Sequence, residues 1–267
     1  MNLTSPSQVK AWCISNGFHP NKTLGQNFLI DRNVLNAIVD AGLEKATPET
    51  DVLEIGPGLG VLTEELLARS RNVTAVEKDP VLASRLKESL GSPEALEVVA
   101  DDALRYIKTL PTDKYGAMVS NLPYQAGTRI LLDLAWKRSV RVMTVLVQTE
   151  VAERLAAKEG SKVRSLSGVL AQLDYDVQIL RKVAANCFWP RPEIGSSVVR
   201  LVRHDRNLTM SQEKRSFFKG FVKKAFAHRR KQLGSIFKDM IKSTSRAEEL
   251  SNADWVALVN DLAEQAN

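Results

Sequence analysis

The stretch Asp51-Val-Leu-Glu-Ile-Gly-Pro-Gly-Leu-Gly-Val-Leu-Thr-Glu restricts the possible folds of this 267-residue chain more than any other feature. Its apolar run predicts a buried strand, its three glycines a tight turn, and its last residues the start of a helix. Three later β-rich runs end at Glu77, Asp102 and Asn121, in steps of 19 to 25 residues counted from the first glycine. This rhythm is typical of consecutive βα units, so we predict an α/β fold with a mostly parallel sheet.

The polar ends of these strands indicate a ligand site, because an open parallel sheet binds ligands beyond the carboxyl ends of its strands. Gly56 and Gly58 would let a ligand approach the backbone, and Glu77 is placed to accept hydrogen bonds from ribose hydroxyls. The dinucleotide fingerprint needs a small residue where this chain has Val61. The pattern Gly-x-Gly-x-Gly after Glu54 is instead similar to the first motif of S-adenosylmethionine-dependent methyltransferases. A nicotinamide-dependent dehydrogenase stays open as the alternative.

The stretch Asn121-Leu-Pro-Tyr has the residue types needed to methylate an adenine amine, whose nitrogen lone pair is delocalised into the ring. The side-chain oxygen of Asn121 and a backbone carbonyl, for which Leu122 is our candidate, would accept both N–H groups and favour a tetrahedral nitrogen. Pro123 would fix the turn, and Tyr124 would stack on the target base. Phe188, expected on an extended loop before two prolines, is our candidate for the second stacking aromatic. Such a site needs no general base, since positioning supplies most of the effect.

The charge of the chain favours a polyanionic partner without establishing one. The net charge is +6 and the pI about 9.3. Residues 214–231 contain eight basic residues and no acidic one, and we predict an amphipathic helix whose Lys219, Lys223 and Arg230 face phosphates. A basic loop, residues 159–165, adds Lys162 and Arg164 as candidates for RNA contacts.

Other features limit the setting of the protein. Cys13 and Cys187 give neither a disulfide framework nor metal-ligand spacing, so we expect no metal site. The chain has no apolar run of membrane-spanning length, and its first residues lack the layout of a secretory signal. We therefore expect a cytoplasmic protein with no membrane partner.

Together these motifs resemble the bacterial ribosomal RNA small-subunit adenine N6-dimethyltransferase A family. The matching stretches run in the order of the family over roughly residues 22–204, and they are Leu24-Gly-Gln-Asn-Phe-Leu, Glu54-Ile-Gly-Pro-Gly-Leu-Gly, Val76-Glu-Lys-Asp, Asp102-Ala, Asn121-Leu-Pro-Tyr, Gln148-Thr-Glu-Val, Gly160-Ser-Lys, Phe188-Trp-Pro-Arg-Pro and Ser197-Val-Val-Arg-Leu. Ala225-Phe with Arg229-Arg-Lys extends the similarity less specifically. The resemblance implies a Rossmann-like methyltransferase domain, residues 1–204, and a small, basic, all-α RNA-binding domain, residues 205–267.

The resemblance also implies which residues bind each ligand. The methyl donor, S-adenosylmethionine, would be held by Asn27, Leu29, Gly56, Gly58, Glu77, Asp102 and Asn121. The RNA would be contacted by Lys162, Arg164, Lys219, Lys223, Arg229 and Arg230. We expect no metal among these ligands.

The family dimethylates N6 of two adjacent adenosines in a hairpin loop near the 3′ end of small-subunit rRNA, late in subunit biogenesis. We therefore expect 16S rRNA, within the 30S subunit or a late precursor, as the partner of a monomer. Two stretches depart from the family pattern: Gln125-Ala-Gly-Thr replaces the more usual Asn-Ile-Ser-Thr, and Val163-Arg-Ser replaces Tyr-Gly. The macrolide-resistance branch, which dimethylates one adenine of large-subunit rRNA, stays open, as does a non-catalytic RNA-binding assembly factor.

Overall fold

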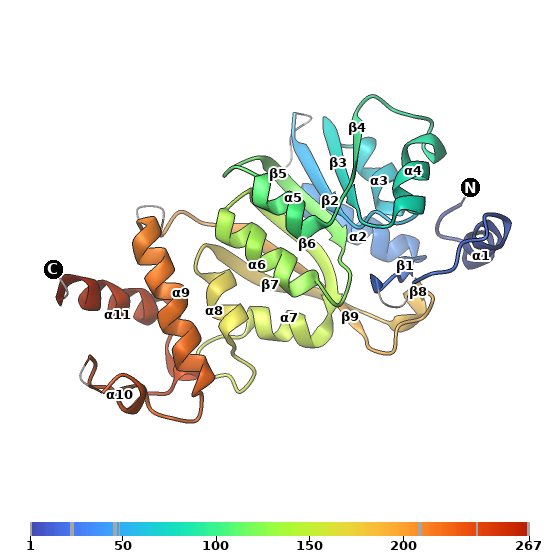
Figure 1. Cartoon of the computed structure of the whole chain (residues 1–267). Helices are drawn as coiled ribbons and strands as arrows, with labels where there is room; N and C mark the ends of the chain where they lie inside the picture. The colour runs from blue at the N-terminus through green and yellow to red at the C-terminus, as the bar shows by residue number, and fades with distance from the viewer. Residues whose placement is uncertain are drawn as a thin grey trace. The chain divides into compact units, whose positions relative to one another are not determined.

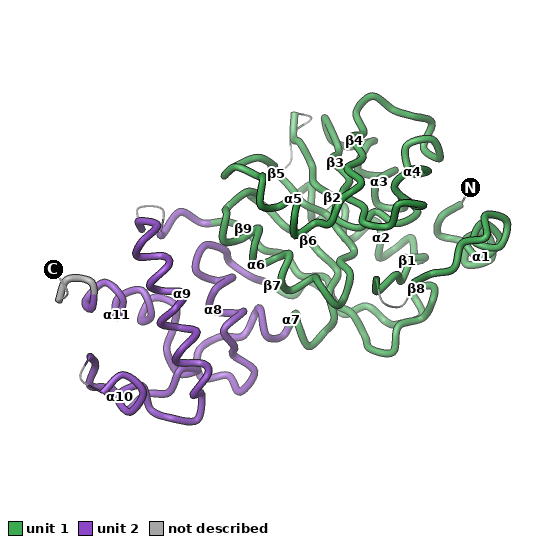
Figure 2. Tube along the Cα trace, viewed as in Figure 1, with its two compact units in different colours: residues 1–152, 178–203 green, residues 153–177, 204–267 purple. Residues whose placement is uncertain are grey.

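The chain divides into two compact units. A computed structural model describes residues 2–21, 24–44, 47, 49–207, 210–238 and 240–265, with side chains described as far as residue 262. Unit 1 comprises residues 1–152 and 178–203, and unit 2 comprises residues 153–177 and 204–267 (Figure 2). Residues 153–177, which the sequence placed in the first domain, therefore cluster with the C-terminal helices. A division into a catalytic and an RNA-binding domain stays a prediction.

A seven-stranded sheet with the order β4-β3-β2-β5-β6-β9-β7 organises unit 1 (Figure 1). Its strands are β2 (Asp51–Ile55), β3 (Asn72–Glu77), β4 (Leu96–Ala100), β5 (Tyr115–Asn121), β6 (Val140–Gln148), β7 (Tyr175–Val183) and β9 (Ser196–Arg203). The first five strands of this order pair in parallel, and β9 runs antiparallel to β6. The predicted α/β fold with a mostly parallel sheet is confirmed. Four consecutive residues of β2 are buried, as expected for a parallel strand covered on both faces.

Helices connect these strands and cover the sheet. They are α1 (Pro6–Ser15), α2 (Arg32–Leu43), α3 (Val61–Leu67), α4 (Pro80–Ser89), α5 (Ala103–Thr109), α6 (Gly127–Lys137) and α7 (Thr149–Ala156), the last of which crosses the unit boundary. Helix α2 packs on β5 and β6, and Asp31 is its N-cap, because a carboxylate oxygen of Asp31 accepts from the Val34 N–H at 2.9 Å. None of the described helices is both long and apolar enough to span a membrane.

The parallel register brings the predicted site residues to one edge of the sheet. Ile55 pairs with Val76, and Glu77 pairs with Ala100, so the carboxyl ends of β2, β3 and β4 are level. Strand β5, which ends at Asn121, is the other neighbour of β2. The four strand ends therefore lie side by side.

A second, two-stranded sheet corrects one prediction. Strand β1 (Phe28–Leu29) pairs antiparallel with β8 (Phe188–Trp189), with Leu29 opposite Phe188. We expected Phe188 on an extended loop, outside any strand pairing, and that prediction is wrong. The two prolines come after Phe188 and Trp189, so the backbone groups of Phe188 and Trp189 can still form hydrogen bonds with β1. The Phe188 side chain is buried in the main apolar core together with Leu29.

Unit 2 has its own core, formed by helices. Helix α8 (Leu166–Gln172) packs on α9 (Gln212–Ala227), which also contacts α11 (Asn252–Gln265). In the sequence, a short helix, α10 (Leu233–Ile236), and a 3₁₀ turn, Ala247–Glu249, come between α9 and α11. Arg215 on α9 forms a buried ion pair with Asp174 at 2.5 Å. Helix α9 ends at Ala227, so Arg229 and Arg230 lie in the turn beyond it and not on the predicted helix.

Candidate active site

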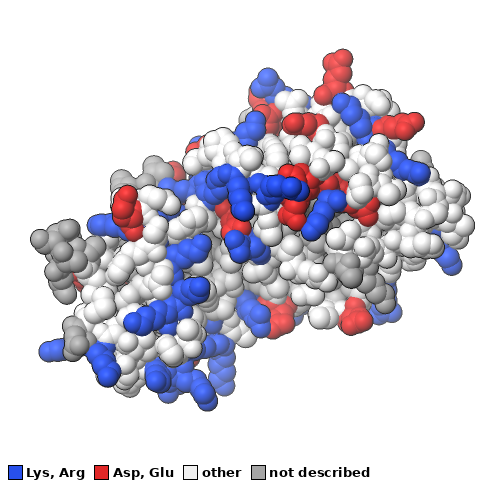
Figure 3. Space-filling model, viewed as in Figure 1, with Lys and Arg blue, Asp and Glu red and all other residues white. Residues whose placement is uncertain are grey.

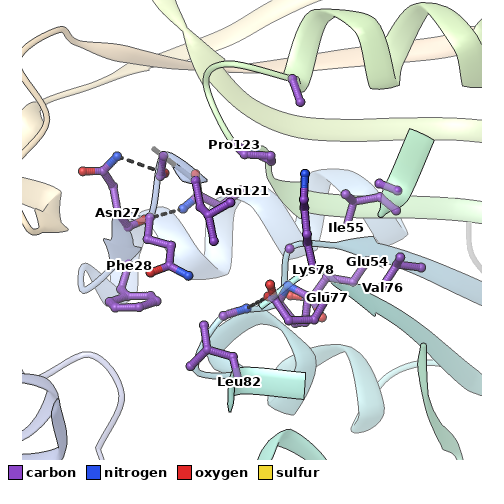
Figure 4. A pocket seen from close by; sticks show the side chains of 18 of the residues that line it. Asn27, Phe28, Glu54, Ile55, Val76, Glu77, Lys78, Leu82, Asn121 and Pro123 are labelled. Atoms are coloured by element: carbon purple, nitrogen blue, oxygen red, sulfur yellow. Dashed lines mark hydrogen bonds between the residues drawn. The ribbon is translucent and has the colours of Figure 1, made fainter. Parts of the chain in front are cut away.

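A cavity of about 220 Å³ opens at the carboxyl edge of the sheet in unit 1. Its wall contains all seven residues predicted to hold the methyl donor: Asn27, Leu29, Gly56, Gly58, Glu77, Asp102 and Asn121. In the view of Figure 4, Asn27 and Asn121 lie on one side of the cavity, and Glu77 and Lys78 lie on the other. Residues from four strand ends and from the N-terminal loop thus meet in one place, while their individual roles stay predictions.

The glycine-rich turn between β2 and α3 is held close to its neighbours. Gly58 has a φ of +60°, and a Cβ added there would lie 3.0 Å from Cε1 of Phe28. The Gly58 N–H donates to Oε2 of Glu77 at 3.0 Å. Only glycine combines this backbone conformation with so close a contact, and Gly56 and Gly58 therefore line the cavity with backbone that no side chain covers.

Two buried carboxyl groups line the cavity. Glu77 accepts from the N–H groups of Gly58 and Asp79, at 3.0 and 2.9 Å, and burial raises its pKa against the effect of these bonds. Glu54 accepts from the Thr63 hydroxyl at 2.7 Å, and burial, with a smaller contribution from Glu77, raises its pKa to about 8. A carboxylate has about four lone-pair sites, so Glu77 keeps acceptor capacity for hydroxyl groups of a ligand.

Asp102 is held as an acceptor at the start of α5. Its Oδ1 accepts from the Leu104 N–H at 2.8 Å, and its Oδ2 pairs with Nζ of Lys78 at 2.9 Å. The bond to Lys78 is the main reason that the pKa of Asp102 lies below its usual value. Asp101, which also lines the cavity, pairs instead with Arg105 at 2.6 Å. Lys78 was not among the residues predicted from the sequence, although its position directly after Glu77 is the signal that could have identified it.

The amide of Asn121 is oriented by a backbone group. Its Nδ2 donates to the carbonyl oxygen of Asn27 at 2.7 Å, across 94 residues of sequence. This assignment leaves Oδ1 of Asn121 as the acceptor for a ligand, which is the atom that the predicted chemistry requires. Asn27 in turn uses its own side chain to donate to the carbonyl of Gly25 at 3.2 Å.

The residues after Asn121 divide between the cavity and the protein interior. Pro123 lines the cavity, whereas the Leu122 side chain is buried. The half-buried Tyr124 shares a 2.6 Å hydrogen bond with the hydroxyl of Ser196, and burial raises the pKa of its phenol. Gln125 and Ala126, where the sequence departs from the family pattern, also line the cavity. Phe188 does not, and at 2% exposure its ring offers no free face in this structure.

The predicted RNA-binding residues lie in unit 2 and differ in accessibility. Lys162, Lys219, Lys223 and Arg230 are exposed, and Figure 3 shows basic side chains gathered over α9. Arg229 lies 3.4 Å from a carboxylate oxygen of Glu248 and donates to the carbonyl of Lys162. Arg229 is therefore held by contacts within unit 2, while its side chain stays partly exposed to solvent.

Arg164 is the exception among these residues. Its side chain is only 1% exposed, and its guanidinium donates to the Ala157 carbonyl at 2.8 Å and to the Asn252 side chain at 2.7 Å. A phosphate could reach it only if this part of unit 2 opened. The structure therefore does not support Arg164 as an RNA contact and assigns it a role in packing.

Known proteins match this chain over most of its length. The family model described as ribosomal RNA adenine dimethylase matches residues 17–265. A ribosomal RNA small subunit methyltransferase A from Deinococcus radiodurans is 42% identical over 232 residues, covering 86% of this chain and 76% of the relative. One of the same description from Corynebacterium efficiens is 37% identical over 257 residues, covering 94% and 88%.

Solved structures support the fold. A dimethyladenosine transferase from Plasmodium falciparum superposes with a TM-score of 0.77 at 22% identity, covering 88% of this chain and 97% of that one. The 23S rRNA methyltransferase ErmE superposes with a TM-score of 0.69 at 24% identity, covering 89% and 100%. At these identities the superpositions show a shared Rossmann-like architecture.

Proposed function

Because the chain belongs to the ribosomal RNA adenine dimethylase family, we propose that it transfers methyl groups from S-adenosylmethionine to N6 of two adjacent adenosines of 16S rRNA. The target is the 3′-terminal hairpin loop, within the 30S subunit or a late precursor, and both adenosines become dimethylated. The relatives named as small subunit methyltransferases favour this target over large-subunit rRNA. We further propose that the protein acts in the cytoplasm as a monomer.

The observation that carries this proposal is the hydrogen bond from Asn121 to the carbonyl of Asn27. It uses Nδ2 and so leaves Oδ1 as the acceptor on a residue that lines the cavity together with Glu77 and Asp102. An adenine amine that donates one N–H to this oxygen and the other to a backbone carbonyl, for which Leu122 is the candidate, becomes more tetrahedral. Its lone pair is then available for the methyl group, and the proton leaves without a dedicated base.

The cavity has the chemical groups that S-adenosylmethionine requires. When bound, the donor supplies an electrophilic methyl group attached to sulfonium sulfur. Glu77 would accept hydrogen bonds from the ribose hydroxyls, and Asp102, ionised beside Lys78, would accept from the exocyclic amine. The side-chain-free turn at Gly56 and Gly58 would let the donor lie against the backbone.

The target base would be held by stacking. Pro123 restricts the turn and lines the cavity. Tyr124, which follows it and is fixed through its hydroxyl to Ser196, would stack on the base that enters there. Stacking of a base on an aromatic side chain contributes about 1 to 3 kcal/mol. Phe188 can take the opposite face only if its side chain leaves the core, which makes Tyr124 the stronger candidate of the two.

The function is tested by methyl transfer to ribosomal subunits that lack the modification. We expect labelled methyl groups on 30S particles, with dimethyladenosine at two adjacent positions, and labelling confined to 50S particles would refute the proposal. Asn121→Ala should abolish transfer while RNA binding stays close to that of the wild type. Asn33→Ala, at an exposed position on α2, is the control and should remain active. A non-catalytic assembly factor would bind 30S particles and transfer nothing.

The RNA-binding part of the proposal has a separate test. Neutralising Lys219, Lys223 and Arg230 together should weaken binding to 30S particles and make its dependence on salt shallower, by up to about 0.9 in logarithmic slope for each lost phosphate contact. An unchanged slope would mean that these exposed residues are only solvated. Binding is measured at several salt concentrations with wild-type and variant protein.

A further inference from the structure

The N-terminal loop that carries Asn27 packs directly on the loop that carries the target-base residues. A Cβ added at Gly25 would lie 3.3 Å from the backbone nitrogen of Tyr124. Two residues later, the Asn27 carbonyl accepts the amide of Asn121 at 2.7 Å. Any displacement of the N-terminal loop would therefore move the group that orients Asn121.

Gln26 fixes this loop with both ends of its side-chain amide. Its Oε1 accepts from the Asn21 N–H at 2.7 Å, and its Nε2 donates to Oδ2 of Asp79 at 2.9 Å. Its backbone N–H also donates to the Asn21 carbonyl at 3.3 Å. Because Gln26 directly precedes Asn27, these bonds determine where the Asn27 carbonyl lies.

Asp79 is a firm anchor for Gln26. It is 9% exposed, and its Oδ1 caps α4 by accepting from the N–H groups of Val81 and Leu82, at 3.0 and 3.3 Å. Its own N–H donates to Oε1 of Glu77 at 2.9 Å. The anchor of the N-terminal loop is thus also a neighbour of the carboxyl group that ends β3.

We propose that Gln26 is a positioning residue for methyl transfer. Through the Asn27 carbonyl it sets the direction of the Asn121 acceptor, and through Asp79 it links that direction to Glu77. This inference rests on the proposed function, in which Asn121 receives the adenine amine and Glu77 holds the donor. Asn121 and the methyl-donor site around Glu77 are then both held in place through Gln26, so that binding of the methyl donor also fixes the position of Asn121.

An exchange of the two interacting groups tests this role. Gln26→Glu places two carboxylates against each other and breaks the contact. Adding Asp79→Asn restores it in reverse, because the new amide can donate to the new carboxylate while its oxygen still caps α4. For Gln26→Glu we expect kcat on 30S particles to fall at least about tenfold, since misplacement of a catalytic group by about 1 Å can cost about 100-fold. The double variant should recover most of this loss.

The dissociation constant of S-adenosylmethionine, measured by titration calorimetry without RNA, is the second readout. We expect it to rise in Gln26→Glu and to recover in the double variant. If wild-type protein does not methylate 30S particles, the proposed function fails, and this constant still tests the contact. Gln8→Glu, the same change at an exposed position of α1, is the control and should alter neither quantity.

Three results would overturn the inference. One is a Gln26→Glu variant with the kcat and the dissociation constant of the wild type. Another is a double variant no better than the single one, because the loss would then not come from the contact between positions 26 and 79. Thermal unfolding of each variant shows whether general destabilisation causes the loss. The third is an equal loss in Gln8→Glu.

Discussion

Replacing Glu54 with glutamine should make the protein more stable at alkaline pH. The Glu54 side chain is 1% exposed at the end of β2, and burial raises its pKa from 4.5 to about 8. The folded protein therefore holds this proton more tightly than the unfolded chain does. Its stabilising effect is fully present below about pH 4.5 and is lost as the pH rises toward about 8. Glutamine stays neutral and keeps an oxygen for the Thr63 hydroxyl.

The size of the effect follows from the shift. Between the unfolded and the folded pKa, each pH unit removes about 1.4 kcal/mol from the free energy of unfolding. Raising the pH from 5 to 8 should therefore cost the wild type on the order of 3 kcal/mol through Glu54 alone. Glu54→Gln escapes this cost, so its advantage over the wild type should grow with pH. Glu77, whose pKa burial also raises, contributes to both proteins in the same direction.

Urea unfolding followed by tryptophan fluorescence at several pH values between 5 and 8 measures this difference. Glu88→Gln, at an exposed position on α4, controls for the removal of one carboxyl group. Parallel pH profiles for the wild type and Glu54→Gln would refute the reasoning, because they would mean that Glu54 holds no additional proton in the folded state.

Three further substitutions test other contacts. Gly58→Ala should destabilise the fold by about 1 kcal/mol or more and weaken the binding of S-adenosylmethionine, because φ is +60° and the new Cβ would lie 3.0 Å from Cε1 of Phe28. Urea unfolding measures the first effect and titration calorimetry the second. Asp174→Asn removes the buried carboxylate that pairs with Arg215 and should lower the free energy of unfolding by about 3 to 5 kcal/mol. Arg164→Met should lower the thermal stability while leaving the salt dependence of RNA binding unchanged.

Each of these changes has a matched control. Gly17→Ala introduces the same backbone strain at a φ of +58° with no neighbour within 4 Å, so a similar loss of donor affinity there would contradict the role of Phe28. Asp176→Asn breaks an exposed pair with Arg206 and should cost no more than about 1 kcal/mol. Lys162→Met should weaken RNA binding at unchanged stability, and the opposite result would exchange the roles of Lys162 and Arg164.

The sequence was sufficient for the parts of the site that a parallel sheet assembles by itself. Glu77 ends β3 and Asn121 ends β5, and these strands are the two parallel neighbours of β2. Their meeting at one edge therefore follows from the order of the strands and needs no knowledge of side-chain packing. Phe188 and Arg164 depend on partners far away in the sequence, Leu29 in one case and Asn252 in the other. Local composition describes both as exposed, and only tertiary pairing shows that they are buried.

The contact between Asn27 and Asn121 also has a consequence for synthesis on the ribosome. Asn27 emerges 94 residues before its partner, which at about 5 to 20 residues per second is a wait of roughly 5 to 20 s. During that interval the Asn27 carbonyl has no amide to accept, and the N-terminal loop has no Tyr124 backbone to pack on. A nascent chain can therefore form its first βα units well before it can hold an adenine.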